Sequence, residues 1–145
     1  MKKFICVFLF CLLPVTSYSG ELLQCKENYL SEFTKNCKEI EFADIAWKKG
    51  SLEIAWSIYS SISEMAKYPL FQSGISLKKV LLAHEMGMDD KAKENTFAFI
   101  KAFIIESDME INRADLELIT ESAMNAILKD AKTFKELFFS FYEGD

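Results

Sequence analysis

His84 is the only histidine in this 145-residue chain, so any reaction that needs an imidazole must use it. Its neighbours at helical spacing, Leu77, Val80 and Leu81, are apolar, which favours a partly buried, hydrogen-bonded side chain over a catalytic base. The sequence HEMGMD, which begins at His84, lacks the second histidine of a zinc-protease helix. We therefore interpret His84 as a structural residue.

The carboxylates do not have the spacing of a reaction centre either. The stretch MDDKAKEN, residues 88–95, lacks the central glycine and terminal glutamate of a calcium loop in register. Paired acids such as Glu106 and Asp108 fall where a helix should end, and turn formation accounts for them. No nucleophile, base and stabiliser come together. The sequence predicts a protein that is not an enzyme and holds no cofactor or metal.

The first twenty residues, MKKFICVFLFCLLPVTSYSG, are typical of a secretory signal peptide. Lys2 and Lys3 give a positive start, an apolar run covers residues 4–15, and small residues precede Gly20. The run is too short for a permanent membrane span, although an uncleaved N-terminal anchor is the alternative. We expect cleavage after Ser19, one mature domain over residues 20–145 without a membrane span, and a periplasmic or secreted protein.

Cleavage would remove Cys6 and Cys11 and leave Cys25 and Cys37 in an oxidising compartment. This predicts one intramolecular disulfide, with free thiols or a bond to another chain as alternatives. A continuous helix between the two cysteines would rise about 18 Å, whereas bonded cysteines need α-carbons within about 7 Å. The disulfide therefore requires a turn, which we expect at Thr34–Asn36.

The mature domain is acidic. Without Lys2 and Lys3, 15 of the 17 basic residues remain against 22 acidic ones, a net charge of −7. Arg113 is the only arginine, and nucleic-acid binding requires clustered basic side chains. The composition therefore argues against a nucleic-acid partner. It is compatible with a basic protein partner or with a merely solvated surface.

Apolar residues recur at spacings of three and four, and no alternating run indicates a strand. The pattern predicts an all-α fold, a compact bundle of roughly five to seven antiparallel helices joined by short turns. The segment over residues 92–105 is apolar on nearly all sides and should form the centre of the core.

Several residues mark helix boundaries. Gly50 and Gly87 should end helices in the left-handed conformation. A loop is expected over residues 68–74, because the residue before Pro69 is driven out of helical geometry. Asn112 should cap a later helix, and Thr133 should begin the last one through a capping box.

Two stretches share one spacing of small residues. Ala46, Gly50 and Ala55 recur as Ala83, Gly87 and Ala92. With Tyr59 at the place of a bulky aromatic, the pattern resembles a degenerate tetratricopeptide or Sel1-like helical hairpin over residues 38–104. The resemblance implies a short solenoid whose concave surface binds a peptide or protein.

The chain also departs from that family. Thr96 stands where the first copy has Tyr59, and neither copy has the tryptophan or the second glycine of the consensus. A third copy would need a glycine where Met124 stands. Generic packing of glycine-ended hairpins gives similar spacing and is the alternative.

Six large side chains near turns or the C-terminus are candidates for partner contact, with burial in the core as the alternative for each. They are Trp47, Trp56, Leu70, Phe71, Phe139 and Tyr142. Together the features predict an exported, non-enzymatic helical protein that binds another protein. Two alternatives are an immunity protein that neutralises a toxin acting in the periplasm, and an accessory or chaperone subunit of an envelope secretion or pilus system. A homo-oligomer is also compatible with the sequence.

Overall fold

Helices make up almost all of the structure. The computed structural model describes residues 20–106 and 108–140, and these contain six helices and no strand. In chain order the helices are α2 (Gly20–Lys48), α3 (Leu52–Met65), α4 (Pro69–Glu85), α5 (Asp89–Glu106), α6 (Arg113–Lys129) and α7 (Ala131–Phe139). The all-α prediction is confirmed. The predicted signal peptide, residues 1–19, lies outside the described residues.

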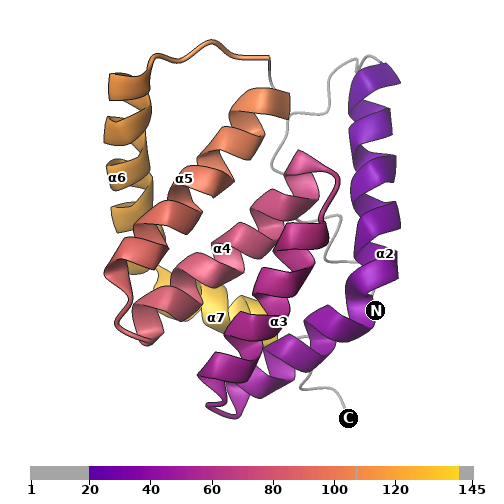
Figure 1. Cartoon of the computed structure of the whole chain (residues 1–145), viewed down its shortest axis with the longest axis vertical. Coiled ribbons are helices and arrows are strands. Elements are labelled where there is room, and N and C mark those ends of the chain that lie inside the picture. Colours follow the sequence, from indigo (N-terminus) through magenta and orange to yellow (C-terminus); the bar gives the residue numbers. More distant parts are fainter. Residues whose placement is uncertain (1–19, 107, 141–145) are drawn as a thin grey trace.

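α4 is the central helix of the bundle. It packs against α2, α3, α5 and α6, and Figure 1 shows it crossing the middle of the molecule between α3 and α5. Its side chains Phe71, Val80 and Leu82 are at most 1 % exposed. The loop predicted over residues 68–74 is wrong, because Pro69 occupies the first position of α4, where its missing N–H is not needed.

α5 is not the centre of the core, so that prediction is wrong. Its main contacts are with α4 and α6. It buries Ala92, Thr96 and Ile100, whereas Phe97 is 37 % exposed and Ile105 is 57 % exposed. An apolar helix that packs mainly on two neighbours leaves part of its apolar surface in contact with solvent.

The two predicted glycine turns have the same geometry. Gly50 and Gly87 have φ angles of +80° and +72°. After α2, the Gly50 N–H donates to the Trp47 carbonyl at 2.9 Å. The next N–H donates to the Ala46 carbonyl at 2.8 Å, and both bonds recur after α4 at 3.0 and 2.8 Å. This is the Schellman arrangement, which satisfies the last carbonyls of each helix. Both glycine predictions are confirmed.

The small residues of the two hairpins are buried. Ala46, Ala55, Ala83 and Ala92 are between 0 and 8 % exposed, as close packing of two helices requires. The second helices of the two hairpins are less alike. Tyr59 in the first donates its hydroxyl to Asp44 of another helix, whereas Thr96 at the matching position in the second donates to the Ala92 carbonyl of its own helix. The hairpins thus share a turn and its alanines, and membership of the tetratricopeptide or Sel1-like class stays a prediction.

α5 ends with the same hydrogen bonds but without a glycine. Asp108 has a φ of +51° and is the only non-glycine residue with positive φ in the described part of the chain. Its N–H donates to the Ile105 carbonyl at 3.4 Å, and the Met109 N–H donates to the Ile104 carbonyl at 3.2 Å. Aspartate tolerates this conformation better than most residues but less well than glycine.

The turns at Gly50 and Asp108 have the same geometry but different residues, so exchanging the residue type should change the free energy of unfolding in opposite directions. Gly50→Ala should lower the free energy of unfolding by about 1 to 2 kcal/mol. A Cβ there meets no atom within 4 Å, so the loss would come from the backbone alone. Asp108→Gly should raise the free energy by about 0.5 to 1 kcal/mol. Urea unfolding at constant m-value measures both, and a destabilising Asp108→Gly would contradict this account.

α2 is one continuous helix, so the turn predicted at Thr34–Asn36 is wrong. The side chains of Thr34 and Asn36 instead bond to carbonyls four residues earlier, at 2.7 and 2.9 Å. Bonds of this kind satisfy polar groups inside a helix and often bend it, and α2 is bent in Figure 1. The helical rise separates Cys25 from Cys37 by about 18 Å, too far for a disulfide. Cys37 is a free thiol in the described structure. The side chain of Cys25 lies outside the described residues, so the bond between the two stays a prediction that would require a break in this helix.

Candidate protein-docking site

His84, the only histidine and therefore the first candidate for a catalytic base, lies at the surface. The His84 side chain is 49 % exposed, and its Nδ1 is 3.7 Å from a carboxylate oxygen of Asp89. That distance fits an ion pair when the imidazole is protonated and exceeds a hydrogen bond. The described residues contain no cluster of three or more histidine, cysteine or acidic side chains that could hold a metal.

A buried ion pair connects four helices. Asp44 of α2 is 2 % exposed, and the Lys78 ammonium of α4 lies 2.7 Å from both of its carboxylate oxygens. Tyr59 of α3 donates its hydroxyl to the same carboxylate. The ammonium also lies 4.5 Å from the ring centre of Phe138 in α7. Because these groups satisfy one another inside the bundle, we interpret the cluster as structural.

Lys78→Met should strongly destabilise the protein, because it leaves the Asp44 carboxylate buried without its counter-ion. The expected loss in the free energy of unfolding is about 3 to 5 kcal/mol. Lys79→Met is the matched control in the next position. The Lys79 ammonium lies 4.8 Å over the Trp56 ring, a contact worth about 1 kcal/mol or less. Equal losses in chemical denaturation would show that the Asp44–Lys78 pair has no special role.

A second polar contact attaches α7 to the bundle. Glu85 accepts hydrogen bonds from the Trp47 indole at 2.9 Å and from the Lys135 ammonium at 2.7 Å. Phe139 packs edge-on against Trp47, with ring centres 5.2 Å apart. Partial burial alone would raise the pKa of Glu85, but the bonds from Lys135 and Trp47 and the charge of Lys135 outweigh it and lower the pKa.

The lowered pKa of Glu85 predicts a pH dependence of stability. A carboxylate with a lowered pKa in the folded state stabilises the fold above its ordinary pKa of 4.5. That stabilisation is lost as the pH falls through the folded-state value. The free energy of unfolding of Glu85→Gln should therefore fall less steeply below about pH 5 than that of the unaltered protein. Lys135→Met should make the free energy of unfolding depend less on pH in the same way. The double variant with Glu85→Gln and Lys135→Met should have nearly the same pH dependence as Glu85→Gln alone. Parallel curves for all four proteins would contradict this assignment.

The aromatic and apolar residues proposed as partner contacts are mostly not available. Trp47 is 2 % exposed and Phe71 is 1 % exposed, so both belong to the core and their assignment is corrected. Leu70, Trp56 and Phe139 are half-buried and pack against the core cluster. Tyr142 lies outside the described residues. Position next to a turn therefore did not indicate which large side chains are exposed.

Four of the ten large apolar side chains that are exposed in the described structure lie where α5 leads into α6. Ile105, Met109, Leu118 and Ile119 are 57, 56, 66 and 41 % exposed. We call the exposed side chains of residues 105 and 108–121 the α5–α6 surface. Leu118 and Ile119 line one hollow together with Ile111. Exposed apolar groups that are contiguous in space are typical of an interaction site, whereas single ones are ordinary.

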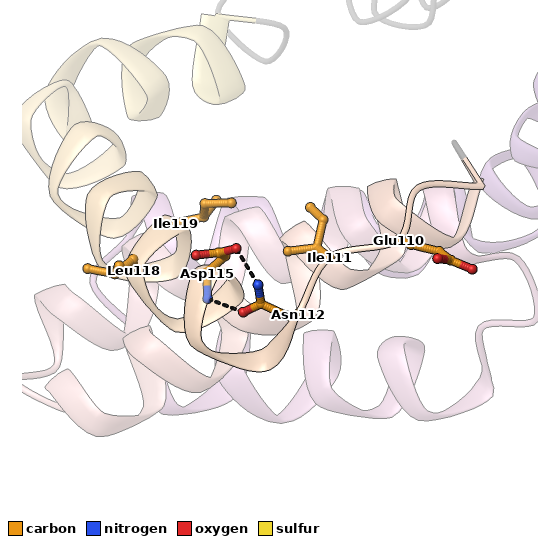
Figure 2. Close-up of a pocket in the computed structure, with 6 residues that line it drawn as sticks. All are labelled: Glu110, Ile111, Asn112, Asp115, Leu118 and Ile119. Carbon is orange, nitrogen blue, oxygen red and sulfur yellow. Dashed lines mark hydrogen bonds between the residues drawn. The ribbon is translucent and has the colours of Figure 1, made fainter.

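A hollow of about 460 Å³ lies within the α5–α6 surface, lined by Glu110, Ile111, Asn112, Asp115, Leu118 and Ile119. Figure 2 shows Ile111 and Ile119 pointing to the same side, whereas Glu110 points away from them. The Asn112 side chain accepts the Asp115 N–H at 2.9 Å, so the predicted cap is confirmed. This cap fixes the start of α6 and with it the directions of Leu118 and Ile119. The capping box predicted at Thr133 is wrong, because α7 begins at Ala131.

The α5–α6 surface is also the most acidic part of the chain. Residues 105–121 contain six acidic side chains and one arginine, a net charge of −5 out of the −7 of residues 20–145. The arginine, Arg113, lies 3.4 Å from Glu117. In the described structure Glu110 and Glu121 take part in no ion pair. Glu110 and Glu121 therefore place negative charge near Leu118 and Ile119 that no ion pair in the described structure balances.

The sequence did not predict this surface, because its candidate contacts were large side chains near turns or the C-terminus and turn formation accounted for its acidic residues. The signal that would have found it is local charge, since six of the 22 acidic residues fall within seventeen positions. Exposure of Leu118 and Ile119 could not be read from spacing, because an amphipathic pattern does not say which helix has a neighbour.

Comparison with protein-family models, with curated proteins and with solved structures gives no match. No helix in the described part of the chain combines the length and the apolar character needed to cross a membrane.

Proposed function

We propose that this chain is an exported, non-enzymatic protein that binds another protein through the α5–α6 surface. One observation carries the proposal. Leu118 and Ile119 stay exposed beside a hollow, although burial of a large apolar side chain is worth roughly 1.5 to 3 kcal/mol. A protein partner that covers these side chains would recover part of that free energy.

The shape of the site favours a protein over a small molecule. Small-molecule sites enclose most of their ligand and place a few polar groups inside. Here the hollow lies between surface side chains at the start of α6, and its polar groups Asn112 and Asp115 are occupied by the helix cap. Such a surface suits side chains that project from a partner.

Two further features support parts of the proposal. The charged start, apolar run and small residues before Gly20 support export to the periplasm or beyond. The matched turns at Gly50 and Gly87 support a short helical-repeat scaffold of the tetratricopeptide or Sel1-like kind. In such scaffolds each hairpin packs on its neighbours.

The acidity of the site favours one second candidate, an immunity protein that neutralises a toxin acting in the periplasm. A concentrated negative potential speeds association with a positively charged partner, which suits rapid capture of a toxin. Deleting the gene would then harm cells only when the toxin is present. Harmless deletion under toxin exposure would exclude this role and leave the accessory-subunit alternative.

Site-specific photo-crosslinking in intact cells tests the main proposal. A photoreactive amino acid replaces Leu118 in one full-length variant and Phe42 in a control variant. Phe42 is 61 % exposed, close to the 66 % of Leu118, but lies on α2. We expect position 118 to form a discrete covalent adduct with a different protein and position 42 to form none.

Equal adducts at both positions, or none at position 118, would contradict binding through the α5–α6 surface. The same cells test export, because the mass of the recovered protein locates its first residue. A mature protein that begins at Gly20 in the periplasmic fraction is expected. A cytoplasmic protein that still carries Met1 would contradict export without affecting the crosslinking result.

A further inference from the structure

We infer that the segment occupying the α5–α6 surface is a cationic amphipathic helix of another protein, with apolar side chains on one face and lysine or arginine on the flanks. The inference rests on the proposed function and specifies the chemistry of its partner. It follows from where the acids lie relative to the exposed apolar groups.

The acids flank the apolar side chains on α6. Residues three apart on a helix are neighbours, so Asp115 and Glu121 lie on either side of Leu118. Glu117 precedes Leu118 directly, and Glu110 lies at the edge of the hollow. A partner that places an apolar side chain on Leu118 must therefore bring its flanking groups close to carboxylates.

We call the carboxylates of Glu110, Asp115, Glu117 and Glu121 the acidic rim. Their charges favour some partners over others. At 4 Å, two unit charges in water interact by about 1 kcal/mol, and an exposed pair typically contributes about 0.2 to 1 kcal/mol. With a net charge of −5 over residues 105–121, lysine or arginine flanks gain this energy, and acidic flanks lose a similar amount. Burial of the apolar face provides most of the affinity, and the rim provides specificity and association rate.

The other occupants of an exposed apolar surface fit less well. A second copy of this chain, bound about a two-fold axis, would place the same acidic rim against itself. An anionic membrane surface and nucleic acid would be repelled in the same way. Because Glu110 and Glu121 take part in no ion pair among the described residues, two carboxylates are available to a cationic partner.

A helix is the form of partner that suits this surface. The apolar groups Leu118 and Ile119 are carried by a helix, and the hollow beside them is lined also by Ile111 of the preceding connection. An amphipathic helix presents apolar side chains at i, i+3, i+4 and i+7, and it docks with that face against apolar surface of a partner. Its polar flanks then face the rim.

Three synthetic peptides of about 18 residues, or about five helical turns, test the inference by their binding to the mature protein, residues 20–145. The first has leucines at i, i+3, i+4 and i+7 spacing and lysines elsewhere. The second replaces every lysine by glutamate, and the third keeps the lysines but replaces every leucine by serine. We expect the first to bind at least about tenfold tighter than either of the others by fluorescence anisotropy. Its affinity should fall as salt is added.

Matched variants locate the binding. Glu110→Gln with Glu121→Gln should weaken the lysine–leucine peptide several-fold. Glu39→Gln with Glu53→Gln makes the same change in net charge at exposed positions on α2 and α3 and should leave its affinity unchanged. Equal weakening by both pairs would show that only net charge matters, which overturns the inference.

The possible failures separate the inference from the proposed function. Equal binding of the lysine and glutamate peptides, or of the serine peptide, overturns the cationic amphipathic partner. The segment captured by the photoreactive group at position 118 gives an independent answer once mass spectrometry identifies it. A captured segment with excess lysine and arginine supports the inference. A neutral or acidic one overturns it while the proposed function stands, and absence of an adduct overturns the proposed function itself.

Discussion

The buried ion pair between Asp44 and Lys78 is the constraint on which the rest of the structure depends. A carboxylate that is 2 % exposed is tolerated only where counter-charge and hydrogen bonds replace its water. Lys78 supplies both oxygens with a partner at 2.7 Å, and Tyr59 adds a third contact. Any shift of α2, α3 or α4 along its axis would break one of these contacts. Apolar packing alone would not impose such a register.

The same ion pair explains how α7 is held although it has no buried residue of its own. Phe138 lies over the Lys78 ammonium, and Lys135 binds Glu85, which also accepts the Trp47 indole. The position of α7 thus depends on α2 and α4 through these polar contacts and through the packing of Phe138 and Phe139 against the core. α5 and α6 lie outside this network, and α6 carries the exposed Leu118 and Ile119 of the proposed docking surface.

What the sequence predicted correctly was local, and what it missed depends on distant neighbours. Gly50 and Asn112 act within one turn of chain, so their roles could be read from residue type and spacing. Burial of Trp47 depends on Tyr59 and on Phe139, far along the chain, and no spacing rule shows that contact. The polar stretch at Thr34–Asn36 was ambiguous, because the same side chains can end a helix or bond back inside one. The proposed docking surface was missed for a related reason, since exposure of Leu118 depends on which faces of α6 other helices cover.

The acidic rim of the α5–α6 surface resolves a conflict between solubility and binding. An exposed apolar patch favours self-association, and a two-fold contact between copies would bring identical rims together. A net charge of −5 over residues 105–121 makes that contact unfavourable. The same charge lowers the free energy of a contact with a cationic helix. Repulsion between copies and attraction to the proposed cationic helix would therefore come from the same carboxylates, so one acidic rim would serve both purposes.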